Sequence, residues 1–228
     1  MSTATLRQSG EYSTTPPRPV TSTEQLIRWG GIANMLAGVL TVAANLLHPP
    51  RSFATLKVIA LLPAWEFVHA LGILALVLTV FALFGAYAVQ VRESARLGFT
   101  GFVLAVSGVI LAVGVLAPDA FIFPVLAEHP VTASLLDVPG RMIPGGSLGL
   151  FMIISAVILN LGYLLFGLAS LRAGVLPVAA SLLILVGILP LTIGALAWPG
   201  IDKVGALLVG LGHLWWGYKL AACSWTLT

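Results

Sequence analysis

The chain has 228 residues, of which 59% are hydrophobic and 8% are charged. A water-soluble domain of this size cannot bury so much apolar surface, so the composition predicts an integral membrane protein and excludes an ordinary aqueous fold. The net charge is +3, but the Lys and Arg residues are scattered between the apolar stretches and form no basic patch, which excludes a nucleic-acid partner.

Residues 1–23 are rich in Ser, Thr and Pro and have no apolar core, which predicts a disordered tail. The capping-box spacing from Thr21 to Glu24 predicts that the first helix begins near Ser22 or Thr23. Residues 24–228 then contain apolar stretches close to the roughly 20 residues that cross a bilayer. We expect six transmembrane helices at about 26–48, 63–88, 98–118, 147–171, 175–197 and 204–222.

The longest connection is the loop 118–146, which follows the third span and contains the short apolar piece 120–127. We expect this piece to lie along the membrane surface or to fold back over the bundle. The fold class is therefore an all-α, polytopic membrane helix bundle. Similar aromatic-Gly pairs recur in alternate spans, at Phe84-Gly85, Phe166-Gly167 and Trp216-Gly217. Three related helical hairpins would explain the recurrence, and so would convergence between apolar helices.

The distribution of Lys and Arg predicts the orientation. Six spans place both termini on one side, and that side carries seven of the eleven cations. Because cytoplasmic segments accumulate Lys and Arg, we expect cytoplasmic N- and C-termini and an external loop 118–146 in a bacterial plasma membrane. Cys223 is the only cysteine, which excludes a disulfide within one chain and a cysteine metal cluster.

Polar residues inside an apolar span are costly, so each of them suggests a partner or a function. In the first span Asn34, Thr41, Asn45 and His48 fall within one narrow arc of the helix. This stripe predicts a face directed into the bundle, either as the wall of a binding site or for hydrogen bonds between helices. Asn160 in the fourth span and Thr192 in the fifth are candidates for the same network.

Glu66 and His69 lie three residues apart in the second span and so share a face. The pair is either a polar group at the outer interface, with Trp65 as an interfacial aromatic residue, or a carboxylate that orients a functional imidazole. We expect Glu66, His69 and the stripe of the first span to line one internal cavity. Asp119, Glu128 and His129 are expected in solvent, although they add ligand-type side chains near the same mouth.

His213 is the histidine nearest to the middle of the membrane. It is either a hydrogen-bonded packing residue or, with His69, an axial ligand of one b-type haem, because the two helices run in the same direction. No pair of ligands has the spacing of a helical zinc site, so no metal is assigned.

Several short landmarks are spread along the chain. They are Leu47-His48-Pro49-Pro50, Trp65 to His69, Phe84 to Tyr87, Pro118-Asp119-Ala120-Phe121 to Pro124, and Leu171-Arg172-Ala173-Gly174-Val175-Leu176-Pro177. Together they resemble a group of uncharacterised small bacterial integral membrane proteins with six spans. The resemblance covers most of residues 26–197 and implies a fold and a location, but no activity. The segment Ala64-Trp65-Glu66-Phe67 is also similar to the acidic segment of fungal integral-membrane terpene cyclases, whose second acid has no counterpart here.

Three classes of function follow. The first is a protein that binds or passes a small lipophilic or weakly polar ligand in a polar-lined pocket near the outer leaflet, contacted by Glu66, His69 and the stripe of the first span. The second is a membrane enzyme or haem electron-transfer subunit, which uses His69 with His213, or Glu66 as a proton donor. The third is a structural subunit or assembly factor within an oligomer or a larger complex.

Overall fold

The computed structural model describes residues 22–49, 56–136, 146–196, 200–223 and 225. Within these ranges the chain is helical and contains no strand. The helices are α1 (Ser22–Leu47), α2 (Leu56–Ile59), α3 (Trp65–Phe121), α4 (Phe123–Glu128), α5 (Pro130–Ala133), the short 3-10 helix η1 (Ser134–Leu136), α6 (Gly146–Ala173), α7 (Val178–Leu196) and α8 (Ile201–Ala222). The all-helical prediction is confirmed, and α1 begins at Ser22 as its capping residues indicate. The predicted disordered tail lies outside the described residues except for Ser22 and Thr23, which are helical.

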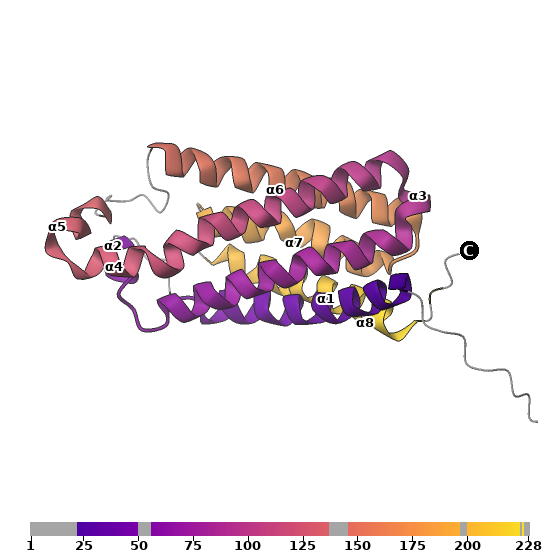
Figure 1. Ribbon diagram of the computed structural model, residues 1–228, viewed down its shortest axis with the longest axis horizontal. Helices are drawn as coiled ribbons and strands as arrows, with labels where there is room; N and C mark the ends of the chain where they lie inside the picture. The colour runs from indigo at the N-terminus through magenta and orange to yellow at the C-terminus, as the bar shows by residue number, and fades with distance from the viewer. Residues whose placement is uncertain (1–21, 50–55, 137–145, 197–199, 224, 226–228) are drawn as a thin grey trace, which may run out of the picture.

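The long helix α3 is a hairpin of two antiparallel arms, 65–94 and 96–121 (Figure 1). The chain reverses at Ala95, whose backbone angles are φ 48° and ψ −144°. The two arms correspond to the second and third predicted spans, but both extend further than expected. In particular, the helix does not end at Pro118 but continues to Phe121, since a proline removes one backbone hydrogen bond without stopping the helix here.

Among the described residues, three helical segments are long and apolar enough to cross a bilayer: Ser22–Leu47, Trp65–Glu128, which joins α3 and α4, and Gly146–Ala173. A shorter apolar helix covers Val178–Gly194. These lengths and compositions are compatible with a membrane location.

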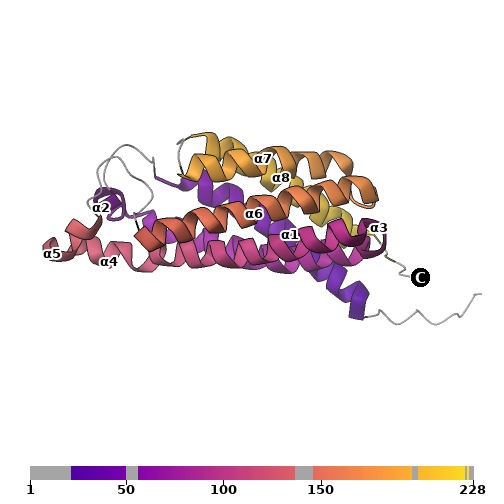
Figure 2. The ribbon, with the colours of Figure 1, turned by 90° about the horizontal axis from the view of Figure 1, so that it is seen from above.

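The packing contacts arrange the long helices in a closed ring, and Figures 1 and 2 show these helices running side by side along the bundle. Helix α1 packs against the first arm of α3 and against α8, α6 packs against the second arm of α3, and α7 packs between α6 and α8. Glycines permit the closest approaches, because they let two backbones meet. Gly30 of α1 meets Gly85 of α3, where an added Cβ would lie 2.7 Å from the facing Cα.

The recurring aromatic-Gly pairs have different partners. Gly85 contacts Gly30 of α1, Gly167 contacts Leu185 of α7, and Gly217 contacts Gly31 of α1. The three glycines are therefore not in equivalent packing positions, and descent from three related hairpins stays a prediction.

Helices α2, α4 and α5 gather at one end of the bundle, called here the α4 end, whereas α1 begins and α8 finishes at the opposite end (Figure 1). At the α4 end a small apolar cluster joins Ile59, Trp65, Phe123, Ala127 and Leu136. The predicted apolar piece 120–127 thus contains the last turn of α3 and most of α4, and it packs over the end of the bundle rather than forming an open loop.

Candidate functional site: a pocket inside the bundle

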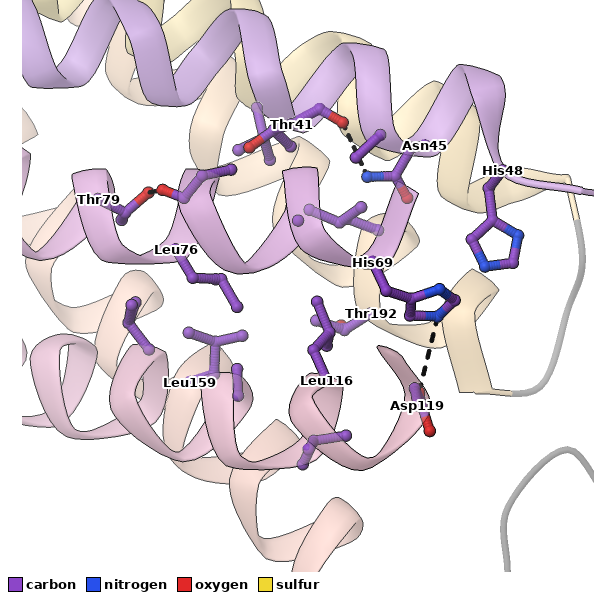
Figure 3. Close-up of a pocket in the computed structure, with 18 of the residues that line it drawn as sticks. Thr41, Asn45, His48, His69, Leu76, Thr79, Leu116, Asp119, Leu159 and Thr192 are labelled. Carbon is purple, nitrogen blue, oxygen red and sulfur yellow. Dashed lines mark hydrogen bonds and ion pairs between the residues drawn. The ribbon is translucent and has the colours of Figure 1, made fainter. Parts of the chain in front are cut away.

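A pocket of about 250 Å³ lies inside the ring of helices (Figure 3). Side chains from α1, both arms of α3, α6, α7 and α8 line it. Along the first arm of α3 the lining runs from Trp65 to Thr79, which corresponds to about 20 Å at 1.5 Å per residue. The pocket therefore begins at the α4 end and reaches deep into the bundle.

Two aromatic rings and a carboxylate lie at the end of the pocket nearest to α4, which is called here the mouth. His69 Nε2 lies 3.8 Å from Asp119 Oδ2, so the pair links the two arms of α3 (Figure 3). The Trp65 ring lies beside that of His69, with the centroids 4.2 Å apart. Trp65 Nε1 also donates a hydrogen bond of 2.6 Å to the backbone oxygen of Asp119. Trp65 thus holds the turn that carries Asp119 against the arm that carries His69.

Backbone carbonyls fix the orientation of both imidazoles at the mouth. His69 Nδ1 donates to the oxygen of Trp65 at 2.7 Å, and His48 Nδ1 donates to the oxygen of Pro49 at 2.8 Å. Because a carbonyl oxygen can only accept, each Nδ1 carries a proton, and Nε2 is the acceptor in the neutral ring. The rings of His48 and His69 lie 5.1 Å apart in an edge-to-face arrangement.

The deep end of the pocket is built around His213, which is buried. Its Nδ1 donates to Asn34 Oδ1, and its Nε2 accepts from the hydroxyl of Tyr163 at 3.4 Å. Tyr163 and the buried Thr79 line the same part of the pocket. The hydrogen bonds connect α1, α6 and α8 at mid-bundle and fix the His213 ring.

Smaller polar groups lie along the walls. Asn45 donates to the backbone oxygen of Thr41 at 2.9 Å within α1. Across the bundle, the Thr192 hydroxyl lies 3.1 Å from Asn160 Oδ1 and joins α7 to α6. Thr41, Asn45 and Thr192 all line the pocket.

The structure brings together most of the predicted site residues. Thr41, Asn45, His48 and His69 line the pocket, and Asn34 lies behind His213 rather than in the wall. The polar stripe of α1 therefore divides into a half that lines the pocket and a deeper half that packs on α8.

Glu66 does not belong to the pocket: it is exposed and absent from the lining. Three residues along a helix leave a rotation of about 60° between two side chains, which is enough here to move Glu66 from the pocket side to the outer side. The carboxylate that faces His69 is Asp119 instead.

The third span was predicted to end at residue 118, and Asp119 was therefore expected in solvent. The missed signal is the seven-residue spacing of Ala105, Ala112 and Asp119, which puts them on one face once the helix continues. Neither Tyr163 nor Thr79 was predicted as a site residue. A single hydroxyl in an apolar span is too weak a signal, because its oxygen commonly bonds the backbone of its own helix, as Thr79 does with Ala75.

His69 and His213 line the same pocket, but their arrangement does not fit a b-type haem. Both ring nitrogens of His213 are used by Asn34 and Tyr163, so iron ligation would have to displace one of them. In the described part of the chain, no group of three or more His, Cys, Asp or Glu residues is placed to hold a metal ion.

Comparisons with protein-family models, curated proteins and solved structures find no match to this chain. The resemblance to small bacterial membrane proteins stays a prediction, and the pocket is the basis for a functional argument.

Proposed function

We propose that this chain is an integral membrane protein that crosses the bilayer six times and binds a small, mainly apolar ligand in its central pocket. The observation that carries the proposal is the pocket itself: apolar walls between two polar ends, enclosed by a ring of helices.

The outer surface supports the membrane location. Large apolar side chains are exposed on every long helix, and Ile110, for example, is 57% exposed. Others are Leu36 and Val39 on α1, Leu74 and Phe81 on α3, Val157 on α6, Val186 and Ile193 on α7, and Leu207 and Leu211 on α8. The buried residues, in contrast, include Asn34, His69, Thr79, Ser170 and His213. A soluble protein does not expose an apolar surface of this extent, whereas a lipid-facing bundle does.

Six spans follow when the two arms of α3 are counted separately and α7 and α8 are included. Each arm of α3 exceeds the roughly 20 residues of a span. With the Lys and Arg distribution of the sequence, this topology puts both termini in the cytoplasm and the α4 end outside. The mouth of the pocket then faces the outer leaflet of a bacterial plasma membrane.

Large side chains close the deep end of the pocket. One helical turn beyond Thr79, Tyr163 and His213 lie Leu83, Phe166 and Trp216, each 1% exposed. The rings of Phe166 and Trp216 meet edge to face, with centroids 6.0 Å apart. A ligand would therefore enter and leave through the α4 end. This favours binding over passage through the bundle.

The size and chemistry of the pocket define the ligand class. Drug-sized ligands occupy pockets of about 300 to 1,000 Å³, so a pocket of about 250 Å³ suits a somewhat smaller molecule. Aliphatic residues such as Val68, Leu76 and Leu159 make up most of the wall, with polar groups at the mouth and floor. The terpene-cyclase hypothesis gains no support, because its proposed proton donor, Glu66, lies outside the pocket.

A pair of phenylalanine substitutions on one helix tests binding. Ala112 lines the pocket, whereas Ile110, two residues away, faces outward. Thermal unfolding of purified protein in nanodiscs is measured with and without 1-octanol. We expect octanol to stabilise the wild type and Ile110→Phe but not Ala112→Phe, whose new ring fills the pocket. Saturation at about 100 times Kd would add about 2.7 kcal/mol. Equal stabilisation of all three proteins would contradict a binding pocket and would leave the structural-subunit alternative.

A further inference from the structure

We infer that the ligand favoured by this pocket is a small lipophilic alcohol, whose hydroxyl group donates a hydrogen bond to Thr79 at the deep end. This inference rests on the proposed function and specifies its ligand class. The deep end, called here the floor, is formed by the side chains of Thr79, Tyr163 and His213. Figure 3 shows Thr79 at the end of the pocket remote from His69.

The burial of the floor is the first argument. Thr79, Tyr163 and His213 are each at most 5% exposed, and they belong to α3, α6 and α8. A polar group that is withdrawn from water in this way costs free energy unless it forms hydrogen bonds. The hydrogen-bonding character of the floor therefore selects between ligands of equal size.

The second argument is that the floor has no donor to offer. His213 Nδ1–H donates to Asn34 Oδ1, and the Tyr163 hydroxyl donates to His213 Nε2 at 3.4 Å. The Thr79 hydroxyl donates to the backbone oxygen of Ala75 at 2.8 Å (Figure 3). A neutral imidazole carries one N–H, and a hydroxyl group carries one O–H. Within the described structure, these bonds use every donor proton of the three floor side chains.

Acceptor capacity, in contrast, remains at the floor. A hydroxyl oxygen that donates its proton keeps lone pairs that can accept. The oxygen atoms of Thr79 and Tyr163 both have this capacity, and the two side chains are near enough to interact. A ligand hydroxyl supplies the matching donor, whereas a ketone, an ether or an ester brings only acceptors. The floor therefore favours an alcohol.

The third argument is the apolar wall next to the floor. Leu76 and Val209 line the pocket one helical turn from Thr79 and His213, on the side of the mouth. A second polar group on the ligand would be buried against such side chains without a partner, at a cost in affinity. The matching ligand therefore carries its hydroxyl at one end of an apolar body.

A different proton position on His213 is the competing arrangement. Asn34 Nδ2 has no hydrogen-bond partner among the described residues, and it would face His213 Nδ1 if the Asn34 amide were turned over. His213 would then donate from Nε2 to Tyr163, whose hydroxyl proton would be free for a ligand carbonyl. In that case the floor would bind a ketone at least as tightly as an alcohol. The structure places Asn34 Oδ1 opposite Nδ1, which favours the alcohol.

Two probes with the same number of non-hydrogen atoms test the selectivity: 1-octanol, which can donate, and 2-octanone, which can only accept. Binding is measured by calorimetry at neutral pH in nanodiscs of zwitterionic lipid. The signal of Ala112→Phe is subtracted to remove partition into lipid. The quantity compared is the affinity for 1-octanol divided by the affinity for 2-octanone. For the wild type we expect this ratio to be about tenfold.

Substitutions of two threonines on α3 assign the effect. Thr79→Val removes the acceptor oxygen and keeps the branched shape, so it should lower the ratio about threefold or more while 2-octanone still binds. The retained ketone binding shows that the variant is folded. Thr79→Ser keeps a hydroxyl group and should preserve most of the ratio. Thr100→Val, the same change at an exposed position outside the pocket lining, should leave the ratio unchanged.

Equal or tighter binding of 2-octanone by the wild type overturns the inference and leaves the binding pocket intact. A ratio that Thr79→Val does not lower also overturns it, because the hydroxyl group of 1-octanol then binds elsewhere. Loss of both probes in Thr79→Val counts against it as well, since removal of one acceptor should spare the ketone. If neither probe distinguishes wild type from Ala112→Phe, both the inference and the proposed function fail.

Discussion

Asn34 and His213 are 179 residues apart in the sequence, yet Asn34 Oδ1 accepts a hydrogen bond from His213 Nδ1 in the centre of the bundle. Both side chains are at least nine-tenths buried. The bond connects the first long helix to the last, and so helps to close the ring around the pocket. It also orients the His213 ring, so that Nε2 faces the hydroxyl group of Tyr163.

Removing both partners of this bond should cost less stability than the two single losses added together. Asn34→Leu leaves His213 with a buried donor that lacks its partner, and His213→Leu leaves an orphaned acceptor. Each should lower the free energy of unfolding by about 1–3 kcal/mol. The loss of unfolding free energy in the double variant should be smaller than the sum of the two single losses, by about 0.5 kcal/mol or more. Equilibrium unfolding of the four proteins in mixed micelles measures this coupling, and strictly additive losses would contradict it.

Gln90 differs from Asn34, because its buried side chain forms no hydrogen bond with the described residues. Its side chain is fully buried, and neither polar atom has a hydrogen-bond partner among the described residues. Replacing an unsatisfied buried amide by an apolar side chain of similar length removes a desolvation cost. We expect Gln90→Met to raise the free energy of unfolding by about 1 kcal/mol. A loss of stability in the same assay would show that Gln90 is bonded to a group outside the described structure. Asn34→Leu, which removes a bonded amide, is the matched control.

A substitution at the turn residue Ala95 should also raise the free energy of unfolding. Its φ of 48° with ψ of −144° lies in a region that glycine occupies readily and alanine does not. Ala95→Gly should therefore stabilise the protein by about 1 kcal/mol. Ala70→Gly, at an exposed helical position of the same α3, should instead destabilise it by about 0.5–1 kcal/mol. If both substitutions lower the unfolding midpoint equally, the hairpin does not turn at Ala95.

The orientation of the bundle is tested by labelling. Ser134 is exposed on η1, at the α4 end. In a Cys223→Ser background, Ser134→Cys should react with a membrane-impermeant maleimide in intact spheroplasts, because the α4 end faces outward in the proposed topology. Reaction only after permeabilisation would reverse the topology and turn the mouth of the pocket toward the cytoplasm.

Much of the fold could be predicted from hydropathy alone, because long apolar stretches determine where helices form. The start of α1 at Ser22 followed from local capping residues. Helices are present where the second and third spans were predicted, as the two arms of α3, but the predicted ends of these helices were wrong. Charged residues between them suggested a loop, whereas the helix persists to Ser94 and resumes at Arg96, so that one residue makes the turn. Hydropathy does not report such backbone geometry.

The site was predictable where polar residues repeated at helical spacing. Thr41, Asn45 and His48 follow one face of α1, and all three line the pocket. The partner of His69 was not predictable in this way. Glu66 is near it in sequence, but Asp119 reaches it across the hairpin of α3. Contacts of this kind depend on how two helices are rotated about their axes, and a single sequence does not specify that rotation.

Accessibility of one pocket residue tests the central claim most directly. Ala112 lines the pocket about 10 Å below Asp119 by helical rise, while Ile110 on the same arm is exposed on the outer face of the bundle. Each is replaced by cysteine in a Cys223→Ser background and treated, in nanodiscs, with a small cationic methanethiosulfonate. A pocket open at its mouth and surrounded by lipid predicts that Ala112→Cys reacts, that 1-octanol slows this reaction, and that Ile110→Cys does not react. An unreactive Ala112→Cys, or an Ile110→Cys that reacts equally fast, would contradict the account.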